Sequence, residues 1–198
     1  MVRLRKREVV QMKTETDIVQ MFERDRETRI LLEAVARLDL PDWWICAGYV
    51  RAKVWDVLEQ KEATAVADID VIYFDASDTT EATDRMLEKR LNAQLPDYPW
   101  SVKNQARMHT KNDLPPYRSS RDAMAQFPET VTAIGLTLHA DRVVFFSAYG
   151  VSDLLQQRLR PTPSFQAPAR HLIYRKRLAE KQWVKNWPGV HEAENEST

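Results

Sequence analysis

Residues 68–75 read Asp68-Ile69-Asp70-Val71-Ile72-Tyr73-Phe74-Asp75 and contain the strongest β-strand pattern in the chain. β-Branched and aromatic residues fill the middle of this run, and polar residues typical of turns flank it. Side chains alternate between the two faces of a strand, so Asp68 and Asp70 leave one face while Ile69 and Val71 take the other. The pattern predicts a strand that is anchored in a core and presents two neighbouring carboxylates.

Two carboxylates at this separation repel each other unless a cation lies between them. Mg²⁺ or Mn²⁺ suits the pair, because such ions take oxygen ligands and leave positions for phosphate oxygens and water. We therefore expect Asp68 and Asp70 to be both the metal ligands and the catalytic residues. Acidic pairs also occur on solvated strand edges, so the pair alone leaves both interpretations open.

The segment upstream of this strand favours the metal-binding interpretation of the acidic pair. It reads Ala47-Gly48-Tyr49-Val50-Arg51 and joins a short apolar run at 43–47 to a helical pattern at 49–60. A glycine between a strand and a helix lets backbone N–H groups approach an anion, and Arg51 in the first helical turn is placed to grip a phosphate. The alternative is an ordinary turn with a surface arginine. We expect Gly48 and Arg51 to bind a nucleotide.

The remaining patterns alternate between helix and strand. Helices are expected at 16–38, at 78–95, between Ser119 and Pro128, at 152–157 and at 169–186, and strands at 100–109, 131–138 and 142–148. The fold class is therefore α/β (α+β), a mixed β-sheet flanked by helices. We expect a charged N-terminal extension at 1–15, one domain with a C-terminal helix at 16–188, and a loose acidic tail at 189–198.

The composition is that of an ordinary globular chain. Of the 198 residues, 43% are hydrophobic and 29% are charged, and the formal net charge of +0 argues against wholesale coating of nucleic acid. Cys46 is the sole cysteine, which excludes an internal disulfide framework. The charged start does not resemble a signal peptide, and no run is long enough for a membrane span. We expect a soluble, cytoplasmic protein without a membrane partner.

Together these motifs carry a family resemblance. Ala47-Gly48-Tyr49-Val50-Arg51 followed by Asp68-Ile69-Asp70 resembles the start of the DNA polymerase β-like nucleotidyltransferases, and is similar to the Gly-Gly-x-Val-Arg and Asp-x-Asp motifs of tRNA CCA-adding enzymes. More specifically, the chain resembles a bacterial nucleotidyltransferase-like family. The segments that carry this second resemblance are 47–56, 68–75, 100–109, 149–155 and 181–188.

The resemblance implies a nucleotidyltransferase-type fold in which the glycine turn holds an NTP triphosphate and Asp68 and Asp70 hold the metal. The implied activity is metal-dependent transfer of a nucleoside monophosphate to an acceptor, which is a small molecule, an RNA or a protein. The chain departs from the family pattern at two places. Ala47 replaces the first glycine of the usual pair, and Ala52 stands where CCA-adding enzymes carry an aspartate.

A third departure concerns catalytic competence. Enzymes of this superfamily normally add a third carboxylate from a neighbouring strand, but no acid lies between Asp97 and Asp113, nor in the two strands expected at 131–138 and 142–148. Asn104 as a neutral ligand and Asp153 from the next helix are the two candidate substitutes.

The strand expected at 100–109 is dense in polar donors. Lys103 and Arg107 share one face of such a strand, and Asn104 lies on the other. A functional interpretation assigns Lys103, Asn104 and Arg107 to nucleotide or polynucleotide binding. The alternative is a solvated face over a core that contains a hydrogen-bonded asparagine.

The helix expected at 169–186 is basic and carries interleaved aromatic residues. Such a helix binds nucleic acid in some proteins, but solvated charges and packed rings are the commoner case. Two alternatives to an active transferase therefore stay open. One is a catalytically inactive nucleotide-binding module, and the other is a nucleic-acid-associated accessory protein.

Overall fold

The computed structural model describes residues 12–193 and places the strand at 69–73 inside a five-stranded mixed sheet. The sheet order is β3-β2-β1-β4-β5. Its strands are β1 (Trp44–Cys46), β2 (Ile69–Tyr73), β3 (Trp100–Asn104), β4 (Ile134–His139) and β5 (Arg142–Ser147). β2 and β3 are parallel, and every other neighbouring pair is antiparallel. The expected fold class is therefore confirmed.

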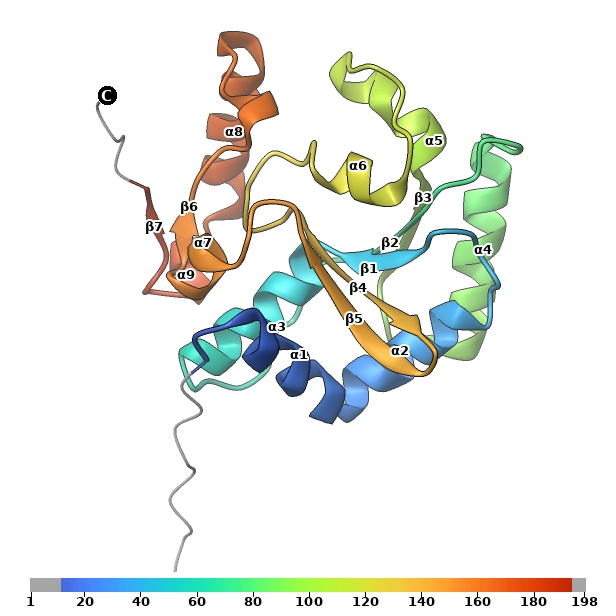
Figure 1. Ribbon diagram of the computed structural model, residues 1–198, viewed down its shortest axis with the longest axis horizontal. Helices are drawn as coiled ribbons and strands as arrows, with labels where there is room; N and C mark the ends of the chain where they lie inside the picture. Colours follow the sequence, from blue (N-terminus) through green and yellow to red (C-terminus); the bar gives the residue numbers. More distant parts are fainter. Residues whose placement is uncertain (1–11, 194–198) are drawn as a thin grey trace, which may run out of the picture.

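Four helices cover one face of the sheet and one shorter helix packs on the other (Figure 1). The covering helices are α1 (Glu15–Arg24), α2 (Arg26–Ala36), α3 (Gly48–Leu58) and α4 (Glu81–Gln94), and they enclose the main core with Ile69 and Val71. Trp44, Cys46 and Ile72 point to the opposite face, where they pack against Met124 of α6 (Ser120–Met124) in a smaller cluster. Asp70 shares this second, less covered face.

The helix expected at 16–38 is divided into α1 and α2 at Asp25. Asp25 has an extended ψ of 104°, and its carboxylate accepts a hydrogen bond from the Thr28 hydroxyl at 2.6 Å. An aspartate that bonds to nearby polar groups competes with helix continuation, and this competition explains the break.

The strand expected at 100–109 ends at Asn104, so that expectation is wrong in its second half. The Asn104 side chain accepts a hydrogen bond from the Ala106 backbone N–H at 3.0 Å and thereby caps α5 (Gln105–Met108). A short 3₁₀ turn, η1 (His109–Asn112), follows. Lys103 and Arg107 therefore lie on different elements and do not share a strand face.

The C-terminal part is more folded than expected. The helix expected at 169–186 is divided at Gln182, whose φ of 46° is left-handed, into α8 (Pro168–Lys181) and α9 (Trp183–Asn186). The chain then adds β7 (His191–Glu192), parallel to β6 (Arg158–Leu159), where we expected a loose tail. The remaining elements are α7 (Ser152–Leu155) and η2 (Pro163–Phe165).

The structure describes only part of the expected N-terminal extension and only part of the expected tail. Of the N-terminal extension expected at 1–15, only residues 12–15 are described, and the end of the tail, 194–198, also lies outside. Within residues 12–193, no helix has both the length and the apolar character needed to cross a bilayer.

Candidate active site

A cavity of about 390 Å³ brings together the glycine turn and the acidic pair. Asp68 and Asp70 line it at the start of β2, and Gly48 and Arg51 line it from the start of α3. A Cβ atom added to Gly48 would lie 4.0 Å from Asp68 Oδ1, so the turn and the carboxylate are immediate neighbours. Four of the seven sequence-predicted site residues therefore meet in one place.

The turn itself is strained at Ala47. Its φ of 54° with ψ of −114° is a conformation that L side chains rarely adopt, and it stands where the related motif has a glycine. The Ala47 N–H donates to the Ile134 carbonyl at 3.0 Å, and its carbonyl accepts from the Arg51 N–H at 3.0 Å. These bonds hold the unfavourable backbone and direct the first turn of α3 toward the cavity.

Substitution of Ala47 by glycine is expected to raise the free energy of unfolding by about 1 kcal/mol. Backbone strain of this kind costs about 1–3 kcal/mol, which exceeds the roughly 0.5–1 kcal/mol entropic cost of the glycine. Urea denaturation measures the change. Ala52→Gly, in the regular part of the same helix, is the matched control and should destabilise; equal destabilisation by both substitutions would show that Ala47 is not strained.

The pKa of Asp70 is shifted because the acidic pair is buried and its two charges lie close together. Burial and the neighbouring charge of Asp68 raise the pKa of Asp70 to about 6, while Lys181, Ser101 and Arg177 act in the opposite direction. The same two carboxylates add to the effect of burial on Cys46, whose thiol pKa is raised well above its usual value. A cation beside Asp68 and Asp70 is therefore electrostatically favoured.

Arg51 is the second distinctive group of the cavity. It is 6% exposed, and its guanidinium carbon lies 4.4, 5.1 and 5.6 Å from the ring centres of Trp183, Trp55 and Trp187. Among the residues that the structure describes, the guanidinium has no hydrogen-bond or ion-pair partner, and its Nε is buried without one. Burial lowers the pKa of Arg51 to about 10, so it remains a cation at neutral pH.

The C-terminal helices supply two further cations that the sequence interpretation missed. Arg177 and Lys181 of α8 line the cavity together with Trp183, Asn186 and Trp187. Tyr174, Arg177 and Lys181 are spaced at i, i+3 and i+7, which places both cations on the same side of α8 as the buried Tyr174. This spacing was the available signal, but we interpreted the charges of this helix as solvated.

A buried acid, Glu129, fixes one of these cations. Arg177 Nε donates to Glu129 Oε1 at 2.8 Å, and the Thr132 hydroxyl donates to Oε2 at 2.7 Å. Burial opposes the charged form of Arg177, but the hydrogen bond and the charge of Glu129 raise its pKa above the usual value. Glu129 is fully buried and therefore acts as a support for Arg177 at the edge of the cavity.

Lys103, Asn104 and Arg107 do not belong to the described lining of this cavity. Lys103 pairs with Glu88 at 3.0 Å and Arg107 pairs with Asp84. Asn104 is fully buried, and its side chain bonds to the backbone of residues 75, 78 and 106. The structure gives these three side chains protein partners away from Asp70.

Among the described residues, no third carboxylate joins Asp68 and Asp70 in the lining of the cavity. On β3, the residue paired with Asp70 is Ser101. The neighbouring strand therefore carries a serine where the family resemblance implies a third carboxylate. Asp153 is engaged with Arg158 at 3.1 Å and with the Thr130 hydroxyl at 2.9 Å, outside the lining. Within residues 12–193, no group of three or more His, Cys, Asp or Glu side chains is arranged to hold a metal ion.

Comparisons with known proteins agree with this geometry. A family model described as nucleotidyltransferase matches residues 33–191. An NMR structure described as revealing a CCA-adding enzyme head domain has 34% sequence identity and a TM-score of 0.85, and the match covers 94% of this chain and 100% of that one. A search of curated proteins found no match.

Longer enzymes share the fold at low identity. A CCA-adding enzyme in complex with ATP and the Thermotoga maritima CCA-adding enzyme in complex with tRNA are each 14% identical, with TM-scores of 0.52 and 0.51. The matches cover 92% of this chain but 43% of each enzyme. The family model and the head-domain match decide the assignment: the chain belongs to the nucleotidyltransferase family.

Proposed function

We propose that this protein transfers a nucleoside monophosphate from an NTP to an acceptor, with Asp68 and Asp70 as ligands of Mg²⁺ or Mn²⁺. The observation that carries the proposal is the meeting of Gly48, Arg51 and the acidic pair in one cavity. In this reaction an acceptor oxygen forms a bond to the α-phosphorus, the bond to pyrophosphate breaks, and the acceptor loses a proton. The acceptor is a small molecule, an RNA or a protein.

The residues of the cavity fit a divalent cation. Asp68 and Asp70 are hard oxygen donors, and burial together with the charge of Asp68 raises the pKa of Asp70, so a cation between the two carboxylates is favoured. When bound, such an ion polarises phosphate oxygens and neutralises developing negative charge. With two protein carboxylates present, the remaining coordination positions suit triphosphate oxygens and water.

We assign the basic side chains of the cavity to binding of the triphosphate. Arg51 is held rigid by three rings and has unused donors, so it binds triphosphate oxygens without first losing a protein partner. Lys181, and Arg177 as positioned by Glu129, add positive charge from α8. The backbone N–H groups of the first turn of α3, which starts at Gly48, would add donors to the same anion. Binding of the triphosphate thus draws on two elements, α3 and α8, that are far apart in the sequence.

Metal binding is expected to weaken as the pH falls below about 6. A carboxylate must lose its proton to act as a ligand, and Asp70 holds its proton up to about pH 6. We expect the Kd for Mn²⁺ to rise about fivefold between pH 6 and pH 5. Calorimetric Mn²⁺ titration at several pH values measures this. An Asp70→Asn variant should bind weakly at every pH; a wild-type affinity that does not change over this range would contradict the assignment.

A second function is favoured by Ser101. Because the neighbouring strand offers a hydroxyl instead of a third carboxylate, the chain is a candidate for binding an NTP without turnover. The basic helix gives less support to a nucleic-acid accessory role, because Arg177 and Lys181 face the cavity and Arg175 pairs with Glu192.

Incubation with each α-³²P-labelled NTP and Mg²⁺ or Mn²⁺ tests the proposal directly. Acceptor pools of RNA, protein and small metabolites are supplied separately, since structures of this fold include complexes with ATP and with tRNA. Transfer of label to one pool, lost in Asp68→Asn, supports the transferase. Metal-dependent NTP binding without transfer to any pool supports the inactive module instead.

A further inference from the structure

A second cavity, of about 320 Å³, adjoins the candidate active site. Ala65 and Val66 line both cavities, because the segment between α3 and β2 passes between them. α3 contributes to both from different sides: Gly48 and Arg51 face the acidic pair, whereas Tyr49 and Lys53 face this second space. Nothing in the proposed transfer reaction uses it.

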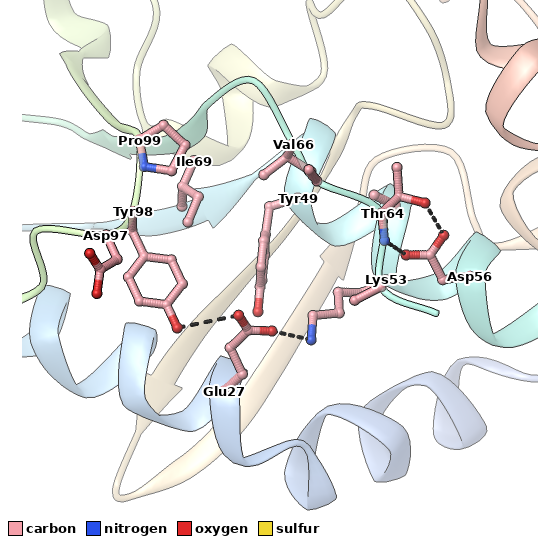
Figure 2. A pocket seen from close by; sticks show the side chains of 13 residues that line it. Glu27, Tyr49, Lys53, Asp56, Thr64, Val66, Ile69, Asp97, Tyr98 and Pro99 are labelled. Carbon is pink, nitrogen blue, oxygen red and sulfur yellow. Dashed lines mark hydrogen bonds and ion pairs between the residues drawn. The ribbon is translucent and has the colours of Figure 1, made fainter. Parts of the chain in front are cut away.

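Two tyrosine rings and an apolar base shape the second cavity. Figure 2 shows the Tyr98 hydroxyl directed to the Glu27 carboxylate and the Tyr49 ring next to it, with Val66 and Ile69 toward the other end of the two rings. Tyr49 is only 4% exposed, and its hydroxyl lies 2.8 Å from that of Thr28, so its ring is fixed. Aromatic walls, an apolar base and a few polar groups are typical of a site for a small molecule.

The charges around this space are predominantly negative. Lys53 is the sole basic residue in the described lining, and its ammonium lies between Asp25 at 2.9 Å and Glu27 at 2.5 Å, so two carboxylates compensate it. Asp97 lines the cavity as well, and among the described residues its carboxylate has no hydrogen-bond or ion-pair partner. Anions are therefore disfavoured and a cation is favoured.

Glu27 retains acceptor capacity for a ligand. Its carboxylate accepts one hydrogen bond from Tyr98, at 3.3 Å, and one from Lys53. An ionised carboxylate offers about four lone-pair positions, so about two remain for a further donor. Asp56, the other acid of the lining, is already occupied by Thr64 and by the indole N–H of Trp187. The open acceptors are thus those of Glu27 and Asp97.

We propose that this second cavity binds a small aromatic amine in its cationic form. The ammonium group donates to the carboxylate of Glu27, Asp97 adds negative charge from the far side of Tyr98, and the ring packs between Tyr49 and Tyr98 near Val66 and Ile69. Charge-assisted hydrogen bonds and cation–π contacts with tyrosine are the two interactions that select such a ligand over a neutral one. The site shares Ala65 and Val66 with the NTP site as a common wall, but it needs neither metal nor nucleotide.

Benzylamine and benzyl alcohol form a matched pair of probes, because they share size and ring but differ in charge. With ¹⁵N-labelled full-length protein, benzylamine should shift the amide resonances of Lys53, Thr64 and Tyr98, which line this cavity and not the candidate active site, with a Kd of about 1 mM or lower. Benzyl alcohol should bind at least about tenfold more weakly, and Glu27→Gln should weaken benzylamine by about tenfold.

A variant that fills the cavity tests the proposal without changing Glu27. Ala63 is exposed and lines this cavity alone, so Ala63→Trp should abolish the shifts, whereas Glu62→Trp, one position outside the lining, should not. Equal affinity for the two probes, no shift at these amides, or shifts centred on Gly48 and Asp70 would each overturn the proposal. NTP binding is measured separately, so failure here leaves the transferase assignment untouched.

Discussion

Replacement of Asp70 by asparagine is expected to abolish nucleotidyl transfer and, in metal-free buffer at pH 7 to 8, to make the protein more stable. Asparagine at this position removes one of the two negative charges that would hold the ion and one of its two protein ligands, so we expect a loss of at least about 1000-fold in kcat/KM. The opposite change in stability follows from the environment of the same carboxylate.

The sign of the stability change comes from the pKa of Asp70, which rises from 3.8 to about 6 on folding. Between these values the folded state binds more protons than the unfolded state, so stability falls as the pH rises through this window and the deficit persists above it. The shift corresponds to about 3 kcal/mol, and to about 1 kcal/mol if solvent screens this half-buried group strongly. Asparagine removes the deficit.

Urea denaturation with EDTA, at pH 7.5 and at pH 4, measures the effect. Asp70→Asn should raise the free energy of unfolding by about 1–3 kcal/mol at pH 7.5 and by much less at pH 4. Glu62→Gln, which removes an exposed acid from the segment preceding β2, is the control and should change stability little. A variant that is destabilised at pH 7.5 would mean that Asp70 is not in a strained electrostatic environment.

Substitution of Arg51 by methionine is expected to weaken NTP binding by about 100-fold with a stability change below about 1 kcal/mol. The loss of affinity follows from the unused donors of the guanidinium, which face the cavity. The small effect on stability reflects two opposing terms. Removal of a buried charge without an ion pair is favourable, but the loss of contacts with Trp55, Trp183 and Trp187 is unfavourable.

The Arg51→Lys variant tests whether NTP binding needs only the positive charge or also the planar shape of the guanidinium. Lysine keeps the positive charge but loses the planar fork and the stacking, so we expect an intermediate loss of about tenfold in affinity. Calorimetry with an NTP and Mg²⁺, together with denaturation of each variant, gives both quantities. If Arg51→Met binds NTP as tightly as the wild type does, Arg51 is a packing residue of the tryptophan cluster and the phosphate assignment fails.

The parts of the site that are close in sequence could be predicted from the sequence. Alternation over residues 68–75 and the glycine turn before Arg51 are local signals, and the cavity unites them as the family resemblance implies. Arg177 and Lys181 lie more than 100 residues further along, so only their tertiary contacts reveal that they face Asp70. Their helical spacing from the buried Tyr174 places both on one side of α8, but it does not show which part of the molecule that side meets.

The errors in the predicted elements have local physical causes. Alternation continues through residues 100–109, but Asn104 turns its side chain to the following backbone and begins a helix, so the pattern misled at that point. At Asp25 and Gln182, hydrophobic periodicity continues across a residue whose backbone interrupts the helix. Such breaks depend on single dihedral angles that periodicity does not register.

The most direct test of the central claim is calorimetric titration of the purified protein with ATP, GTP, CTP and UTP, with and without Mg²⁺, beside an Asp68→Ala/Asp70→Ala double variant. We expect at least one NTP to bind in a Mg²⁺-dependent manner, and the double variant to lose that dependence. The absence of NTP binding by the wild-type protein, or binding that is the same with and without Mg²⁺ and unaffected by the double substitution, would contradict a metal-dependent nucleotide site at Asp68 and Asp70.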